Sequence, residues 1–194
     1  MGGRALAAGK KNARRLKAWL VFEDETGFSQ RPPVRATWAP RGQTPVLVES
    51  FNWKKLSGLG AVRTDADGRR LRWFLSLRAG SVRAPVLVRF VRALRRQVRK
   101  PVILLWDRLP AHRSARVRQE LRRQRHWLRV EWLPAYAPQL NPLEPLWDWL
   151  DDQALANTPV EELGRLGQRV RRALRRLEQR PTIGRGLLRY TGLF

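Results

Sequence analysis

The chain has 194 residues, 43% hydrophobic and with no cysteine, so it can bury one core and has no disulfide or thiolate metal site. No apolar run reaches the roughly 18 residues of a membrane span, and the N-terminus lacks the apolar core of a secretory signal. Forty basic residues against 16 acidic ones give a net charge of +24, which predicts a polyanionic partner, above all nucleic acid.

Arginine dominates the positive charge. There are 34 arginines and six lysines, and the planar guanidinium group binds phosphate through two parallel hydrogen bonds. The arginines are spread over several expected elements, which disfavours an acidic membrane surface as the partner. A general arginine bias with ordinary solvated faces is the alternative to nucleic-acid binding.

The N-terminal part predicts a basic segment and then a short buried strand. Residues 1–17 are expected to form a basic arm, in part helical, and the apolar run at 19–22 is typical of a buried strand. Three acids follow it directly. Strand alternation places Glu23 and Glu25 on one face and Asp24 on the other. Taken alone, these acids are better explained as a polar strand end.

The next segment predicts a turn-rich stretch and a hairpin. Among several prolines and glycines, residues 37–38 and 46–48 are expected to be short strand pieces. Residues 56–63 and 71–77 are expected to pair as two strands, because an Asp-Gly turn signal at 67–68 lies between them.

A helix and a central strand come next. Ser81 is expected to cap a helix over residues 82–99, whose apolar side chains recur on one face. The continuous apolar run at 102–106 is typical of a strand covered on both sides, and it ends abruptly in Asp107.

The last third predicts a basic helix over 114–125, a strand over 128–133 and two further helices. Asn-Pro-Leu-Glu at 141–144 is a helix start, with an asparagine cap, a proline at the first position and a glutamate in the first turn. The final amphipathic helix carries leucines on one face and arginines on the other over 163–177, after a similar Thr-Pro-Val-Glu start.

This order of elements predicts the fold class. Strands come first, and helices then alternate with strands. We therefore expect an α/β fold with a mixed β-sheet, in which an antiparallel meander precedes parallel strands and helices cover both faces.

Three acids occupy matching places in this expected fold. Asp24 and Asp107 each follow a core strand, and Glu144 opens the helix after the last strand. Ligand sites of open α/β sheets gather at strand ends, and converging carboxylates need hard divalent cations to hold them together. Two such ions about 4 Å apart are the general device for phosphodiester chemistry. Each acid alone could instead be a turn or capping residue.

Four segments, at 22–29 (FEDETGFS), 35–47 (RATWAPRGQTPVL), 104–114 (LLWDRLPAHRS) and 132–150 (WLPAYAPQLNPLEPLWDWL), carry a family resemblance. Together they resemble the DDE endonuclease domain of bacterial insertion-sequence transposases related to mariner elements. The resemblance implies an RNase H-like fold, two Mg²⁺ or Mn²⁺ ions, and DNA strand cleavage and transfer.

The resemblance also implies roles and boundaries. The first acid of the family falls on Asp24, the second on Asp107 and the third on Glu144, all three as catalytic metal ligands. The catalytic domain would span residues 18–157, between the basic arm at 1–17 and a C-terminal basic amphipathic helix and tail at 158–194.

DNA contacts are expected near the second acid, from Arg108, His112 and Arg113. His112 matches a frequent motif histidine, and a role as a hydrogen bonder at the loop or helix start is an equal alternative. The partners implied are double-stranded DNA, meaning transposon ends and target, and a second copy of the chain in a homodimer. A cytoplasmic, nucleoid-associated protein without membrane contact is expected.

Two departures from the family pattern accompany the resemblance. The helix-turn-helix region that reads transposon ends is not found before the first strand, which suggests a separately encoded reader, a decayed copy or a fragment. Asp151 and Asp152 stand where the family often has a basic residue, and Asp148 and Asp151 share a helix flank with Glu144. Their negative charge should repel DNA.

Two other functions therefore stay open. One is a catalytically impaired transposase remnant that only binds DNA, and the other is an RNase H-type nuclease acting on hybrid duplexes. Trp147 is expected to pack in the core, since it lies on the apolar stripe of its helix, although tryptophans of this stretch could also stack on flipped bases.

Overall fold

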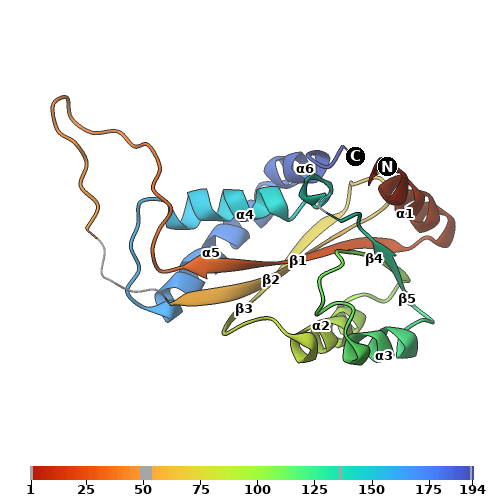
Figure 1. Cartoon of the computed structure of the whole chain (residues 1–194). Coiled ribbons are helices and arrows are strands. Elements are labelled where there is room, and N and C mark those ends of the chain that lie inside the picture. The colour runs from red at the N-terminus through yellow and green to blue at the C-terminus, as the bar shows by residue number, and fades with distance from the viewer. Residues whose placement is uncertain (1, 49–53, 136, 193) are drawn as a thin grey trace.

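A five-stranded mixed sheet organises the computed structural model, which describes residues 2–48, 54–135, 137–192 and 194 (Figure 1). The strand order is β3-β2-β1-β4-β5. Strands β1, β2 and β3 pair antiparallel, whereas β4 and β5 run parallel to β1. The strands are β1 (Trp19–Ser29), β2 (Lys55–Thr64), β3 (Leu71–Ala79), β4 (Val102–Trp106) and β5 (Leu128–Trp132). The expected meander followed by parallel strands is confirmed.

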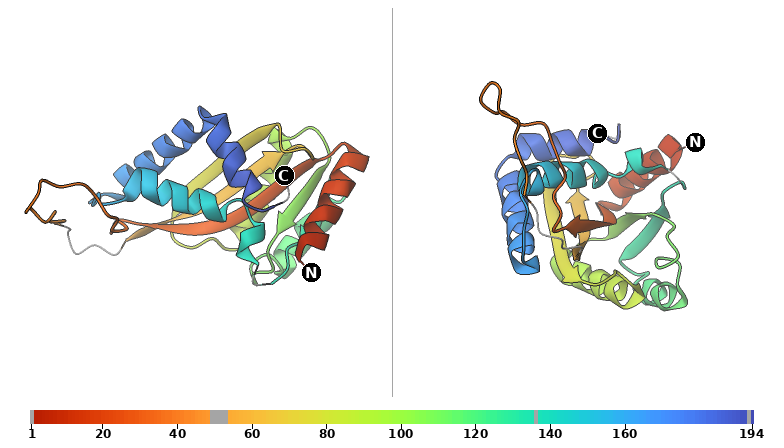
Figure 2. Two further views of the ribbon diagram at one scale, coloured as in Figure 1. Left: turned by 90° about the horizontal axis from the view of Figure 1, so that it is seen from above. Right: turned by 60° about the vertical axis from the view of Figure 1, so that its left-hand side comes forward.

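Helices cover both faces of the sheet, as expected (Figures 1 and 2). On one face lie α2 (Ala84–Gln97) and α3 (Ala115–Arg123). The other face carries α1 (Gly2–Leu16), the short turn η1 (Pro138–Leu140), α4 (Glu144–Leu150), the π-helical turn η2 (Asp151–Leu155), α5 (Leu163–Glu178) and α6 (Pro181–Arg189). None of the helices in these described ranges is long and apolar enough to cross a membrane.

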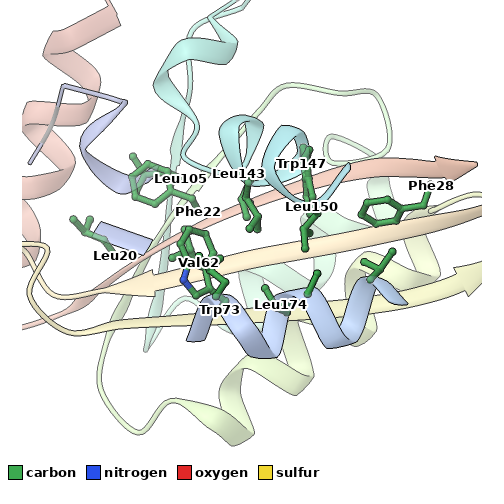
Figure 3. Close-up of a cluster of buried hydrophobic side chains, with 14 of the residues drawn as sticks. Leu20, Phe22, Phe28, Val62, Trp73, Leu105, Leu143, Trp147, Leu150 and Leu174 are labelled. Carbon is green, nitrogen blue, oxygen red and sulfur yellow. The ribbon is translucent and has the colours of Figure 1, made fainter. Parts of the chain in front are cut away.

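Strand alternation divides the core into two layers. Leu20 and Phe22 of β1 point into the layer beneath α4 and α5, together with Leu143 and Leu174 (Figure 3). Val21 points into the opposite layer beneath α2 and α3. The layer beneath α4 also holds the buried Ala13 of α1, with Leu16 packed against it, so the basic N-terminal segment is a packed helix of this domain.

The segment after β1 differs from the expectation of short strand pieces at 37–38 and 46–48. Through residue 48 it has no regular secondary structure, and Trp38 is fully exposed. Figure 1 shows this segment standing away from the sheet. Because strands need a hydrogen-bonding neighbour, an apolar run that leaves the sheet cannot form one.

Two helix starts also differ from the sequence-based expectation. Helix α2 begins at Ala84 after Arg83, so Ser81 is not its cap. Helix α5 begins at Leu163 and not at the preceding Thr-Pro-Val-Glu. That segment is held by Gln30, whose carbonyl oxygen accepts from the N–H of Val160 and whose side chain donates back to the Val160 carbonyl at 3.1 Å.

Candidate metal centre

The first two predicted acids follow neighbouring parallel strands. In the β1–β4 register Phe22 lies opposite Leu105, so Asp24 and Asp107 each come two residues after this pair. Parallel strands end at the same edge of a sheet, and the two carboxyl groups therefore meet there. One carboxylate oxygen each of Asp24, Glu25 and Asp107 lies within 4.8 Å of the other two.

The third predicted acid reaches this edge from helix α4. Buried Asn141 ties the helix start to β1, since its side-chain amide donates to the Glu23 carbonyl at 3.4 Å and its oxygen accepts from the Leu143 N–H. The helix itself begins at Glu144. Leu143 takes the N-cap position, so Asn141 is not the cap that the sequence predicts, and its own N–H donates to the Pro138 carbonyl.

Electrostatics connect Glu144 to the other two acids. Burial raises the pKa of Asp24 to about 7, against a hydrogen bond from Trp147, and the charges of Glu144 and Glu25 raise it further. Burial also raises the pKa of Glu144, followed by the charges of Asp148 and Asp107. Glu144 is thus within electrostatic range of both acids, although it lies outside the described set of oxygens within 4.8 Å.

These carboxylates fit a hard divalent cation. They are oxygen donors and lie close together, and burial together with neighbouring negative charge raises the pKa values of Asp24 and Glu144. One buried carboxylate oxygen of Glu25 has no hydrogen-bond partner among the described residues. A bound cation would relieve the repulsion and provide a partner for such oxygens.

The opposite face of β1 carries a second group of ionisable side chains. Glu23 is fully buried and accepts a hydrogen bond from the indole N–H of Trp106. Burial raises the pKa of Glu23 well above its ordinary value, and the charge of Glu25 adds to this. His112 lies 3.8 Å from Glu23 and stacks on Trp106 with ring centroids 4.2 Å apart.

His112 links this group to the acids at the strand ends. Its Nε2 lies 3.0 Å from a carboxylate oxygen of Glu25, and its Nδ1 is hydrogen-bonded to Asp107. Burial lowers the pKa of His112, but the hydrogen bonds to Asp107 and Glu25 outweigh it and raise the pKa to about 10. Burial also opposes ionisation of Asp107, whereas the bonds from His112 and the Leu109 N–H leave its pKa lowered. The protonated ring therefore neutralises part of the acid cluster.

The expected DNA-contacting residues separate into two kinds. Arg108 and Arg113 are exposed, whereas the side chain of His112 is fully buried. This placement favours the hydrogen-bonding alternative for His112.

The acids at the end of α4 are partly compensated. Asp152 forms an ion pair with Arg35 at 2.8 Å. Burial raises the pKa of Asp151 to about 6, the charge of Asp148 raises it further, and Arg35 opposes both. Asp148 itself is exposed. The negative flank expected beside Glu144 therefore receives a counter-charge from the segment after β1.

Sequence reasoning missed three members of this site. Glu25 joins the oxygen cluster, Trp106 donates to Glu23, and Trp147 donates to Asp24 at 2.9 Å. The alternation of Glu23 and Glu25 was the available signal for a shared partner. The sequence does not predict the path of the loop that brings His112 to these two acids, because that path depends on tertiary packing.

Comparison with known proteins decides the family. Residues 19–167 match the family model of the DDE superfamily endonuclease. This chain belongs to the DDE superfamily endonuclease family. The chain is also 26% identical over 155 residues to an uncharacterised 39 kDa protein of the insertion element IS630 from Shigella sonnei, covering 78% of this chain and 43% of that protein.

Solved structures share the fold of this DDE endonuclease. The mariner Mos1 paired-end complex with Mg matches with a TM-score of 0.64 and 20% identity over 98% of this chain and 58% of that one. The Mos1 paired-end complex with the left transposon end matches with a TM-score of 0.59 and 21% identity over 94% and 60%.

These matches confirm the expected RNase H-like fold. The family uses divalent metals, in keeping with the acidic cluster. The chain spans less than half the length of the insertion-element relative and about three-fifths of the Mos1 chains.

Proposed function

We propose that this chain is the catalytic domain of a transposase, which cleaves DNA strands and transfers them to target DNA in a metal-dependent reaction. The observation that carries the proposal is the meeting of Asp24 and Asp107 at the ends of adjacent parallel strands, with Glu144 in electrostatic range. Family membership supports the endonuclease chemistry, and the relative encoded by an insertion element supports transposition.

The three acids would hold two Mg²⁺ or Mn²⁺ ions. Asp24 and Asp107 would bind metal jointly and Glu144 would complete the second site, with Glu25 as an additional candidate ligand. Bound metals supply activation of the attacking oxygen and stabilisation of the leaving oxygen. The all-oxygen donor set is the one that Mg²⁺ and Mn²⁺ prefer.

The reaction has two phosphoryl-transfer steps. Water attacks a backbone phosphorus, the bond from phosphorus to the 3′ oxygen breaks, and that oxygen takes a proton to become a 3′-hydroxyl. The 3′-hydroxyl then attacks a phosphorus of target DNA, displaces a target 3′ oxygen and loses its proton. One phosphodiester is thus made for each one broken in the second step.

The residues around the acids would hold the carboxylates in place and bind the DNA. His112 keeps Glu25 and Asp107 in place and offsets their charge. Exposed Arg108 and Arg113 would contact DNA phosphates, within a chain whose net charge of +24 favours DNA binding.

The partners follow from the same proposal. They are transposon-end and target DNA, a second copy of the chain in a homodimer, and a separately encoded helix-turn-helix region. Two of the similar Mos1 structures are named as paired-end complexes, one of them with the left transposon end, which supports transposon-end DNA as a partner. We assign the chemistry to residues 18–157, with 1–17 and 158–194 as basic flanking segments, in a cytoplasmic protein associated with the nucleoid.

Asp107→Asn tests this function. The wild-type chain should nick supercoiled DNA in Mg²⁺. The nicking rate of Asp107→Asn should be lower by at least about 10²-fold, because even residues that only support a metal ligand contribute about 10- to 100-fold. Salt-dependent DNA binding should persist, since it rests on the arginines. Asp67→Asn is the matched control, because Asp67 is an exposed acid on the hairpin turn that pairs with Arg14.

Three results would contradict the proposal. Undiminished nicking by Asp107→Asn would remove Asp107 from the site. DNA binding by the wild type without any nicking would indicate a remnant that only binds DNA. Cleavage of RNA–DNA hybrid without cleavage of DNA duplex would indicate an RNase H-type nuclease.

A further inference from the structure

The indole of Trp147 joins helix α4 to the first predicted acid. Trp147 is buried and lies three residues after Glu144 on the same helix. Its Nε1 donates a hydrogen bond of 2.9 Å to Oδ2 of Asp24. One side chain thus connects the helix that carries the third acid to the strand that carries the first.

A glycine makes room for this indole. Gly60 of β2 lies directly opposite Asp24 in the antiparallel register, so a side chain there would point to the same face of the sheet. A Cβ at Gly60 would lie 2.2 Å from Cη2 of Trp147 and 2.8 Å from Cζ2. The ring therefore fills the space above the backbone of Gly60, and no other residue type leaves that space free.

The ring is also fixed from the side. Phe28 of β1 meets it edge to face, with ring centroids 6.0 Å apart and an interplanar angle of 79° (Figure 3). The indole thus has Gly60 below it, Phe28 beside it and Asp24 at its N–H. These three contacts fix its position. A purely structural core residue needs the first two contacts but not the third.

We propose that Trp147 is a positioning residue that holds the Asp24 carboxylate and sets its separation from Glu144, and that Gly60 is required for this. The inference rests on the proposed function, since it concerns the geometry of the same metal-binding acids. Residues three apart on a helix are neighbours on its surface, so a fixed indole also fixes where Glu144 stands relative to Asp24. Metal ligands need such supporting contacts to keep their geometry.

Trp147→Phe separates positioning from packing. Phenylalanine keeps an aromatic ring in the core and removes only the N–H donor and the outer ring atoms. Trp73→Phe is the matched control, because Trp73 is a buried tryptophan of the same core layer on β3, a strand that carries none of the acids. Each variant is examined by Mn²⁺ titration with electron paramagnetic resonance, by thermal unfolding and by nicking kinetics.

Trp147→Phe should weaken Mn²⁺ binding by about 10- to 100-fold, as replacement of a residue supporting a metal ligand does. It should lower kcat for nicking and leave KM for DNA nearly unchanged, because Trp147 is buried in the core and offers little surface for DNA to contact. Trp73→Phe should leave Mn²⁺ affinity and kcat at wild-type values. Wild-type Mn²⁺ affinity in Trp147→Phe would overturn the inference while leaving the proposed function intact. Absence of Mn²⁺ binding by the wild type would overturn both.

Gly60→Ala tests the contact from the other side. The added methyl group should displace the indole and lower both the unfolding temperature and the Mn²⁺ affinity. Trp147→Phe removes Cη2 and Cζ2. Gly60→Ala should therefore destabilise the Trp147→Phe variant less than it destabilises the wild type, which a double-mutant cycle measures. Additive effects in that cycle would show that the ring does not depend on Gly60, and would overturn this part of the inference.

Discussion

Asp24→Asn should abolish metal-dependent strand cleavage and at the same time make the metal-free protein more stable. The amide can still accept the hydrogen bond from Trp147, but it cannot supply the charge of a metal ligand. Cleavage should fall by more than about 10²-fold, since even supporting residues contribute about 10- to 100-fold.

The gain in stability follows from the raised pKa of Asp24. Burial raises this pKa from 3.8 to about 7, so between these values the folded protein binds more protons than the unfolded one. Stability then falls as pH rises through this window. At pH 8 the ionised carboxylate costs up to roughly 4 kcal/mol, because the pKa differs by about 3 units at 1.36 kcal/mol per unit, and Asp24→Asn should recover this amount.

Urea denaturation at pH 8 with and without Mg²⁺ measures these effects. Without metal, Asp24→Asn should be the more stable protein. Mg²⁺ should stabilise the wild type and leave the variant unchanged, because only a folded state that binds the ion gains from it. Equal stabilisation of both proteins by Mg²⁺ would show that Asp24 is not a ligand.

His112→Ala should destabilise the fold by about 3–5 kcal/mol at pH 6, as removal of one partner from a buried ion pair does. The ring touches the half-buried Glu25 and Asp107 and lies near the buried Glu23, so its loss leaves these carboxylates without their cation. The pKa of His112 is raised from 6.5 to about 10, so its contribution is complete below pH 6.5 and is lost as pH rises through 10.

The matched control is His126→Ala, because His126 is the second histidine of the chain and is exposed. Denaturation curves from pH 6 to pH 10 should show no effect of that change. For His112→Ala, the difference from the wild type should shrink as pH rises. A difference that is absent at pH 6, or that is constant with pH, would exclude a charged His112 in the cluster.

The sequence predicts best those elements whose cause is local. Five consecutive apolar residues at 102–106 indicate a covered strand, and all five are buried in β4. The Asp-Gly turn signal predicts the β2–β3 hairpin because Gly68 takes a positive φ of 71°, which glycine adopts readily. The strand-then-helix order is enough to predict the mixed sheet.

Partnerships between distant residues were beyond the sequence. Alternation places Glu23 and Glu25 on one face, but not the histidine that lies 87 residues after Glu25. Trp147 lies on the apolar stripe of its helix, so the hydrophobic periodicity predicts that it is buried. The periodicity does not predict its hydrogen bond to Asp24. The sequence around Gly60 does not predict its role, because that role depends on the indole of Trp147, which packs on it from α4.

Failures of helix prediction have the same origin. Thr-Pro-Val-Glu before α5 has the residue types of a helix start, yet Gln30 of another segment takes up its backbone groups. Local preference for a cap is about 1 kcal/mol, which two tertiary hydrogen bonds can offset.

The central claim is that Asp24, Asp107 and Glu144 together hold the divalent ions of a DNA-cleaving enzyme. Mn²⁺ titration of the full chain, followed by electron paramagnetic resonance, tests it most directly. The wild type should bind two ions, Glu144→Gln should lose the second, and a variant combining Asp24→Asn with Asp107→Asn should bind none. A wild type that binds no Mn²⁺ at millimolar concentrations, or a double variant that binds it as the wild type does, would contradict the claim.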